Sequence, residues 1–246
     1  MREQIDTIPV NEAFESGDEC PFCWLERMSE QKSIRYILGP GASYMEPDVR
    51  GMTDAQGFCR EHTKKMYDFG NALIMQTYMA CLIEEFDREA GNFQAPPPKK
   101  LFGKKEVQAE SGLLEKMRQR QQTCCLCEKL EYNMRRYFHT FFVLLKEPEF
   151  RAKVEASKGL CMRHFVKLLE MAKEELPNSQ REWFYNTMIP LTRDNLVRVK
   201  EDLDHFVSMF DYRSAGRDWK NSRDAVSRTM QKLQGLYPAD PPYKDK

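Results

Sequence analysis

Residues 124–127 read C-C-L-C and residues 159–164 read G-L-C-M-R-H, which gives a C-x-x-C pair followed by a C-x-x-H pair. The same pattern occurs earlier, where residues 20–23 read C-P-F-C and residues 57–62 read G-F-C-R-E-H. Three cysteines with one histidine are an established ligand set for structural zinc. Two similarly spaced copies therefore predict a duplicated scaffold in which each half carries its own metal site.

The predicted ligand sets follow the order of the chain. One set is Cys20, Cys23, Cys59 and His62, and the other is Cys124, Cys127, Cys161 and His164. The spacing within each pair puts both side chains on one helical face or around one tight turn. At a helix start, free backbone N–H groups and the positive end of the dipole lower a thiol pKa and favour the metal-bound thiolate. Four protein ligands fill a tetrahedron, so we expect two structural zinc ions rather than a hydrolytic metal.

Alternatives to structural zinc stay open at this point. An iron–sulfur cluster also uses cysteine-rich sets, and a C-x-x-C pair can carry out redox chemistry or remain unmetallated. Cys125 occupies the place of Pro21 in the first copy and is therefore interpreted as a spare thiol, although a small register shift would let it replace Cys124. Arg60, Glu61 and Arg163 lie inside the C-x-x-H motifs and either support the sites or are surface charge.

Composition sets the class of protein. The chain has 246 residues, of which 41% are hydrophobic and 31% are charged, as is ordinary for a globular protein. Lys and Arg total 38, equal to Asp and Glu, so no net field attracts nucleic acid or anionic lipid. We see no apolar run long enough for a signal peptide or a membrane span. The expected location is the cytoplasm, where reduced thiols more often bind metal than form disulfides.

Apolar residues recur at helical spacing, and almost no stretch alternates in the manner of a strand. The predicted class is all-α, with two related three-helix units, each holding a Cys3His site, and a C-terminal helix. The expected divisions are a first repeat (1–90), a Pro- and Lys-rich linker (91–110), a second repeat (111–212), and a last helix with its tail (213–246).

Several local features follow from this division. Residues 1–19 are expected to form an extended arm. A helix is expected to start near Thr53 or Asp54, before Cys59, and Pro190 should kink or divide the helix over 179–210. The segments E-P-D-V-R at 46–50 and E-P-E-F-R at 147–151 occupy equivalent places, which supports the repeat. Gly57 and Gly159 suggest a positive φ or a close backbone approach before each C-x-x-H pair.

No catalytic constellation is visible. The chain lacks a glycine-rich phosphate loop, a nucleophile elbow, an H-E-x-x-H motif and a carboxylate pair placed for acid–base work. The aromatic residues of 137–142 and 183–185 are expected to form a helical core. A deep cavity lined by Phe141, Trp183 and Tyr185 would instead favour an enzyme or a small-molecule binder. An enzymatic role is therefore not favoured.

The segments I-P-V-N-E-A-F (8–14), E-C-P-F-C (19–23) and M-E-P-D-V-R (45–50), with the two C-x-x-H motifs, resemble an uncharacterised bacterial domain-of-unknown-function family. Some of its members are labelled ABC transporter substrate-binding proteins. The resemblance implies a short cytoplasmic protein and brings no catalytic residue with it. The transporter label fits poorly, because we see no signal peptide, no lipid-anchor cysteine near the start and no α/β pattern.

The hypothesis from the sequence is a non-enzymatic, zinc-stabilised helical protein that acts as a macromolecular interaction or regulatory module. An unknown protein partner is expected, nucleic acid and membrane are not, and the oligomeric state is open. The amphipathic C-terminal helix, with Trp219, Val226, Met230 and Leu233 on one face, is the expected docking element. The alternative is an iron–sulfur or thiol redox protein.

Overall fold

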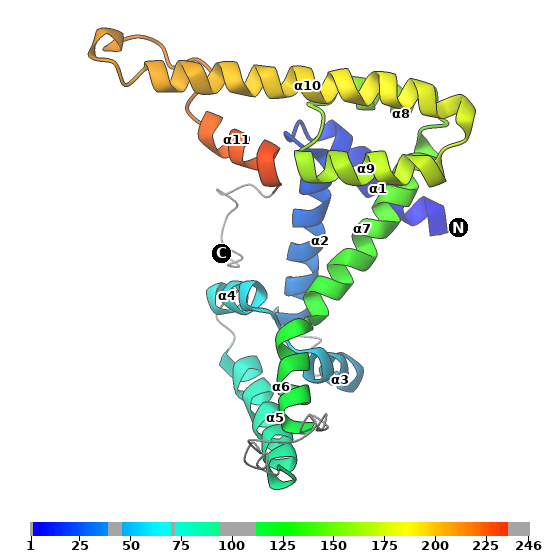
Figure 1. The fold of residues 1–246 in the computed structure, drawn as a ribbon, viewed down its shortest axis with the longest axis vertical. Coiled ribbons are helices and arrows are strands. Elements are labelled where there is room, and N and C mark those ends of the chain that lie inside the picture. Colours follow the sequence, from blue (N-terminus) through cyan, green and yellow to red (C-terminus); the bar gives the residue numbers. More distant parts are fainter. Residues whose placement is uncertain (1, 39–45, 70–71, 94–111, 236–246) are drawn as a thin grey trace, which may run out of the picture. The chain divides into compact units, whose positions relative to one another are not determined.

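The structure is a computed structural model that describes residues 2–38, 46–69, 72–93 and 112–235 (Figure 1). Every regular element within these ranges is helical, which confirms the all-α class. In chain order they are α1 (Arg2–Glu15), α2 (Pro21–Leu38), α3 (Pro47–Gln56), α4 (Arg60–Phe69), α5 (Ala72–Gly91), α6 (Gly112–Gln122), α7 (Cys125–Leu144), α8 (Pro148–Ala156), α9 (Met162–Glu175), α10 (Asn178–Ser208), η2 (Tyr212–Ser214) and α11 (Ala225–Gln234). In the described ranges, no helix is both long and apolar enough to cross a membrane.

The chain folds into two compact units that do not follow its linear order. Unit 1 combines the described parts of Met1–Ser29 and Glu131–Pro241, and unit 2 comprises those of Glu30–Leu130. Helices α2 and α7 each contribute residues to both units. The expected linker at 91–110 begins where α5 ends, but residues 94–111 lie outside the described residues, as does the tail from 236.

Unit 1 is built around an aromatic core. Phe14 of α1 stacks on Phe141 of α7 at 5.5 Å between ring centroids and meets the edge of Phe150 of α8 at 5.2 Å. Phe22 of α2 packs at 5.5 Å from Phe141, and Phe184 of α10 completes the cluster. All five rings are buried. Each buried ring contributes roughly 2–3 kcal/mol of hydrophobic free energy, so this cluster holds the helices of the unit together.

The prediction of an extended arm at residues 1–19 is wrong, because residues 2–15 form the helix α1. Val10, Ala13 and Phe14 lie at helical spacing and are buried. Packing against the core therefore outweighs the low helical preference conferred by Pro9, which lies inside the helix. Pro190 likewise lies inside α10, which continues through it as a single helix.

Unit 2 has a separate apolar core. Its buried members come from α2, α3, α4, α5 and α7 and from the residues just before α4 and α7. They are Ile34, Ile37, Leu38, Val49, Phe58, Met66, Ile74, Cys124, Cys125 and Leu126. Helices α5 and α6 pack together, and Arg120 of α6 forms an ion pair with Glu85 of α5. The helix expected near Thr53 is wrong in its boundaries, because α3 begins at Pro47 and ends at Gln56, and α4 begins after Cys59.

The two E-P segments begin short helices. Pro47 opens α3 and Pro148 opens α8, and each proline occupies the first turn, where its missing N–H costs no hydrogen bond. Gly57 follows α3 with φ of 66°, and Gly159 follows α8 with φ of 70°. A side chain at Gly159 would press on the backbone at Thr192, 3.2 Å from its Cβ. The positive φ expected at both glycines is confirmed.

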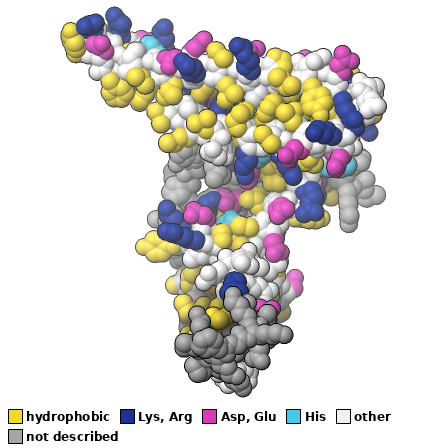
Figure 2. Space-filling model, in the orientation of Figure 1, with side chains coloured by type: hydrophobic (Ala, Val, Ile, Leu, Met, Phe, Trp, Pro, Cys, Tyr) yellow, Lys and Arg dark blue, Asp and Glu magenta, His cyan; other side chains and the backbone are white. Residues whose placement is uncertain are grey.

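Helix α11 buries its polar side. Arg228, Gln231 and Lys232 are at most 8% exposed, whereas Met230 and Leu233 are 51% and 53% exposed. The polar side faces the rest of unit 1, and α11 packs there against α9 and α10. Figure 2 shows hydrophobic side chains at the surface in the part of unit 1 where α10 and α11 lie. Val226, Met230 and Leu233, expected on one apolar face, therefore point outward, but the placement of Trp219 on this helix is wrong, because Trp219 precedes α11 and packs against Phe206 and Phe210.

Candidate metal centres

The structure brings the eight predicted ligands into two groups, but it exchanges their partners. The first site contains Cys20, Cys23, Cys161 and His164, and the second site contains Cys59, His62, Cys124 and Cys127. Within each group the ligand atoms all lie within 4.8 Å of one another. The prediction that each half of the sequence holds its own four ligands is therefore wrong. Each site takes one C-x-x-C pair and one C-x-x-H pair from opposite halves.

The reason for the exchange is tertiary packing. The spacing of the two ligands within a pair is a local property of one helix start. Which second pair completes the site depends on which helix starts the fold brings together. In unit 1 the start of α2 meets the start of α9, and in unit 2 the start of α4 meets the start of α7. The sites are consequently nested along the chain, with the outer two pairs forming one site and the inner two pairs forming the other.

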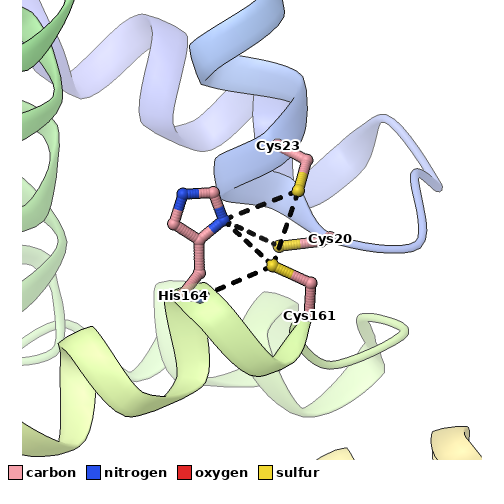
Figure 3. Close-up of side chains that lie close together, drawn as sticks. All are labelled: Cys20, Cys23, Cys161 and His164. Atoms are coloured by element: carbon pink, nitrogen blue, oxygen red, sulfur yellow. Dashed lines mark hydrogen bonds between the residues drawn. The ribbon is translucent and has the colours of Figure 1, made fainter. Parts of the chain in front are cut away.

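The first site lies between the N-terminal ends of α2 and α9 (Figure 3). The Nδ1 atom of His164 is 3.5 Å from the Sγ atoms of both Cys20 and Cys23 and 3.3 Å from that of Cys161. The sulfurs of Cys23 and Cys161 are 3.6 Å apart. Cys161 is the N-cap of α9, and its sulfur accepts a hydrogen bond from the backbone N–H of His164.

The second site has the same plan at α4 and α7. The Nδ1 atom of His62 lies 3.2 Å from Sγ of Cys59, 3.3 Å from that of Cys124 and 3.4 Å from that of Cys127. The sulfurs of Cys59 and Cys127 are 3.7 Å apart. Cys59 and Cys124 immediately precede their helices, and His62 and Cys127 lie in the first turns. All four pairs in the chain thus span a helix N-terminus.

These separations match the edges of a metal tetrahedron. Bond lengths of about 2.3 Å for Zn–S and about 2.05 Å for Zn–N give edges of about 3.8 Å between two sulfurs and about 3.5 Å between sulfur and nitrogen. The sulfur–sulfur distances of 3.6 and 3.7 Å and the sulfur–nitrogen distances of 3.2–3.5 Å fall close to these values. The sulfurs are not disulfide-bonded. Both groups are therefore shaped to hold one ion each.

The electrostatics of the two groups favour a cation. Burial opposes ionisation of Cys124, but hydrogen bonds from His62 and from backbone N–H groups lower its pKa to about 6. Hydrogen bonds from Cys20 and Cys23 lower the pKa of Cys161. Burial disfavours the imidazolium of His164, yet the Cys161 and Cys20 sulfurs raise its pKa to about 10. The histidine charge therefore favours one thiolate in each group, and a divalent ion can replace the histidine proton.

Two glutamates of α2 lie behind the histidines, and one of them is within hydrogen-bond distance. The outer nitrogen of His62, Nε2, lies 3.0 Å from Oε1 of Glu30, which also pairs with Lys65. The Nε2 atom of His164 lies 3.8 Å from Oε2 of Glu26. A carboxylate behind a ligating histidine fixes its tautomer and strengthens it as a ligand. Sequence reasoning missed both glutamates, because their spacing of four residues on one helix does not indicate which histidines lie opposite.

The charged residues of the C-x-x-H motifs differ in their roles. Arg163 forms an ion pair with Glu26 and lies 3.4 Å from Nε2 of His164, so it belongs to the surroundings of the first site. Arg60 and Glu61 are exposed.

Cys125 is buried in the core of unit 2, where burial and the neighbouring Cys124 raise its pKa to about 12. Its sulfur is not among the atoms grouped at the second site.

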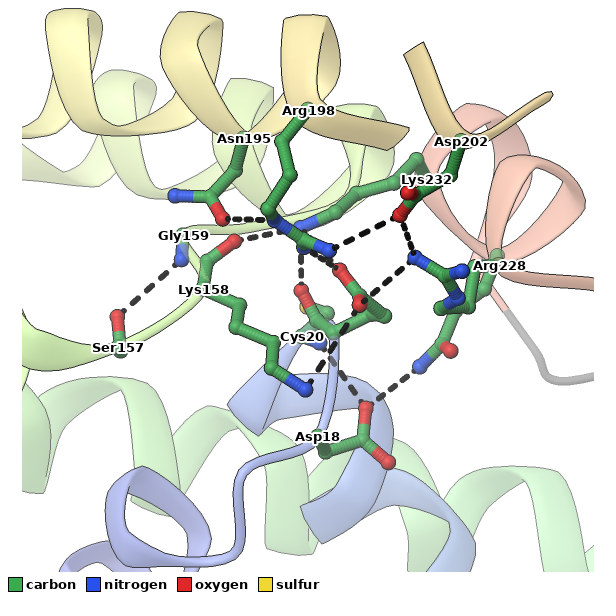
Figure 4. A network of polar contacts seen from close by, with 12 residues as sticks. Asp18, Cys20, Ser157, Lys158, Gly159, Asn195, Arg198, Asp202, Arg228 and Lys232 are labelled. Carbon is green, nitrogen blue, oxygen red and sulfur yellow. Dashed lines mark hydrogen bonds and ion pairs between the residues drawn. The ribbon is translucent and has the colours of Figure 1, made fainter. Parts of the chain in front are cut away.

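A buried charge network adjoins the first site through Glu19, the residue before Cys20. Figure 4 shows Arg198 and Lys232 of this network close to Cys20. Lys232 of α11 donates to the backbone carbonyls of Glu19 and Lys158, both at 2.6 Å, and lies 3.3 Å from the Glu19 carboxylate. Arg198 of α10 donates to the same carboxylate at 2.5 Å. Gln231 of α11 donates to Asp18 at 2.6 Å. This network fixes α11 beside the metal-ligand loop.

The aromatic clusters serve as core. Phe141 and Phe184 are fully buried, and the guanidinium of Arg151 covers the ring of Trp183 at 4.5 Å.

A pocket of about 610 Å³ lies elsewhere in unit 1, lined by residues of α1, α7 and α9 that include Arg135, His139 and Thr140. His139 forms an exposed pair with Glu175 at 3.0 Å, and His205 contacts the backbone oxygen of Asp218 at 3.1 Å. Neither histidine adjoins a metal-ligand group.

The model of a family of unknown function, DUF6062, matches residues 1–240 of the chain. No curated protein and no solved structure matches it.

Proposed function

Since the chain belongs to the DUF6062 family of unknown function, we propose its role from its own candidate metal sites. The proposed role is that of a non-enzymatic helical protein in which one structural zinc ion holds each of the two units. This protein acts as a protein-interaction or regulatory module. The observation that carries the zinc assignment is the pair of closed four-ligand sets with tetrahedral spacing. Three thiolates and a neutral imidazole leave no coordination position for a substrate. The metals would therefore stabilise the fold rather than catalyse a reaction.

The compactness of each group favours a single ion over an iron–sulfur cluster. A cluster distributes its protein ligands over several iron atoms and so holds them farther apart than the edges of one tetrahedron. The separations of 3.2 Å between Cys59 and His62 and of 3.7 Å between Cys59 and Cys127 support one ion rather than such a core. Zinc fits the donor set, because it prefers thiolate and imidazole ligands in a tetrahedron.

Metal analysis of the purified chain tests the assignment. We expect a colourless protein that contains about two zinc ions per chain by elemental analysis and by native mass spectrometry. A brown protein with iron and inorganic sulfide would overturn the zinc assignment and favour the alternative. A chain that folds with no metal at all would overturn both.

The interaction role is supported by the outward apolar face of α11. Val226, Met230 and Leu233 lie at helical spacing, and they are 40%, 51% and 53% exposed. Contiguous exposed apolar surface of this kind is typical of interaction sites. The proposed partner is a protein that presents a complementary apolar surface to this helix.

A variant with Met230→Glu and Leu233→Glu tests the interaction role. Both side chains are exposed, so the variant should keep two metal ions and the wild-type melting temperature. In affinity capture, we expect the variant to lose the partner protein that the wild-type chain retains. Light scattering reports whether that partner is a second copy of this chain. Identical partners and identical oligomeric state for both proteins would contradict the role of this face.

A further inference from the structure

We propose that the second site is a peroxide-sensitive site, in which Cys59 and Cys127 are oxidised to a disulfide and the metal is released, while the first site keeps its metal. This inference rests on the proposed zinc occupancy. It adds a functional difference between two sites that have the same types of ligand, three cysteines and one histidine. The two groups have nearly the same internal distances. They differ in what surrounds them.

The first site is sealed from solvent. Its four ligands are at most 4% exposed. Gly235, at the C-terminal end of α11, packs so closely that a Cβ there would lie 3.5 Å from Sγ of Cys23 and 3.2 Å from the Arg163 guanidinium. The network of Glu19 and Lys232 fixes α11 in this position. An oxidant in water therefore has no direct path to these sulfurs.

The second site is open on one side. Cys127 is exposed and Cys59 is half-buried, whereas Cys124 and His62 are buried. Because thiol oxidation follows access as well as thiolate character, a metal-bound thiolate at Cys127 is the preferred target of a dissolved hydroperoxide. A second accessible thiolate is within reach, since the sulfur of the half-buried Cys59 lies 3.7 Å away, whereas Cys124 is buried. The two sulfurs must approach by about 1.7 Å to reach a disulfide bond of about 2.05 Å.

The chemistry balances with hydrogen peroxide as the oxidant. The Cys127 thiolate attacks one peroxide oxygen, the O–O bond breaks, and the released hydroxide takes a proton to become water. The Cys59 thiolate then attacks the sulfenic sulfur of Cys127, so that an S–S bond forms, the S–O bond breaks, and a second water leaves after protonation. The two sulfurs lose two electrons in total, and the peroxide gains them. The zinc ion stays divalent and departs, since only Cys124 and His62 remain to hold it.

The zinc-loaded, full-length protein provides the test. Treatment with hydrogen peroxide in the presence of a chromogenic zinc chelator should release one zinc equivalent in a fast phase. Release of the second equivalent should be slower by about tenfold or more, because the first site excludes the oxidant. Peptide mapping of the oxidised protein should find the Cys59–Cys127 disulfide. A thiol reductant with added zinc should restore the original metal content.

Two variants make the result specific. Cys127→His keeps four tetrahedral ligands at an exposed position but removes the disulfide pair, so it should retain both zinc ions and lose the fast phase. The double variant Cys81→Ser and Cys125→Ser removes the two thiols outside the sites and should release zinc like the wild type. If Cys127→His does not hold zinc, the disulfide map of the wild-type protein decides the question.

Equal release rates for the two sites, a Cys23–Cys161 or Cys124–Cys127 disulfide, or no release under peroxide would overturn this inference. These outcomes differ from a failure of the proposed function. In that case the purified protein would lack zinc before any oxidant is added.

Discussion

Cys124 and Cys125 are adjacent, buried thiols with opposite chemical tendencies. Hydrogen bonds lower the pKa of Cys124 to about 6, and burial raises that of Cys125 to about 12. Only the Cys124 sulfur lies among the ligand atoms of the second site. The identity of the ligands was readable from the sequence, because helix starts and i, i+3 spacing are local properties. The glutamates behind the histidines were not, because they depend on which helix lies opposite.

At the residue scale, Cys161→Ser should remove one metal equivalent and destabilise the protein. A loss of about 4 kcal/mol corresponds to a fall in melting temperature of roughly 10 °C for a chain of this size. Metal analysis and calorimetry provide the measurements. Cys125→Ser is the matched control and should keep both metals. Full metal content in Cys161→Ser would remove this cysteine from the first site.

Glu30→Gln tests the support behind His62. Glu30 lies 3.0 Å from the outer histidine nitrogen. Loss of its charge should weaken metal affinity at the second site by about 10–100-fold. Competition with a zinc chelator of known affinity measures the change. Glu26→Gln is the comparison, and it should have a smaller effect at the first site, because Glu26 lies 3.8 Å from His164. Unchanged affinity in Glu30→Gln would show that the contact does not tune the ligand.

At the scale of elements, the sequence predicted a helix over 179–210, close to the observed α10, but it did not predict α1 or the orientation of α11. An apolar stripe normally indicates the buried face of a helix. In α11 the buried face is instead Arg228, Gln231 and Lys232, because unit 1 offers them carboxylates and carbonyl oxygens. Sequence periodicity contains no information about such partners. The orientation of this helix therefore required the structure.

Lys232→Ala tests the polar anchoring of α11. It removes the ammonium that binds Glu19 and leaves that buried carboxylate with fewer partners. We expect a loss of about 2–4 kcal/mol in the free energy of unfolding, measured by urea denaturation. Met230→Ala, on the exposed face, should change it by no more than about 0.5 kcal/mol. A larger effect of Met230→Ala than of Lys232→Ala would mean that the apolar face is the buried one.

At the scale of the whole molecule, the sequence predicted the all-α class and eight ligand candidates, but it predicted the wrong partners for them. Two repeats in a row suggest two self-contained sites, since each half contains one complete ligand set. The structure instead joins the outer pairs to each other and the inner pairs to each other. A single sequence does not distinguish these two arrangements, because both satisfy the same ligand count and the same local spacing.

Cys20→Ser distinguishes the two arrangements in the intact chain. Loss of this ligand should empty the first site and raise the alkylation rates of Cys23 and Cys161, as measured by mass spectrometry with a thiol reagent. Cys59 should react as it does in the wild type, because it belongs to the other site. Faster alkylation of Cys59 together with Cys23 would contradict the observed grouping and support a site formed within the first half of the sequence.

The nested arrangement also imposes an order on biosynthesis. The inner ligands span residues 59–127 and have all left the ribosome before the outer set, which spans residues 20–164, is complete. Closing the inner loop shortens the free chain that the outer set must still bring together, and so reduces the entropy lost in that step. With the proposed metal occupancy, the inner site of a nascent chain can therefore fill before the outer site.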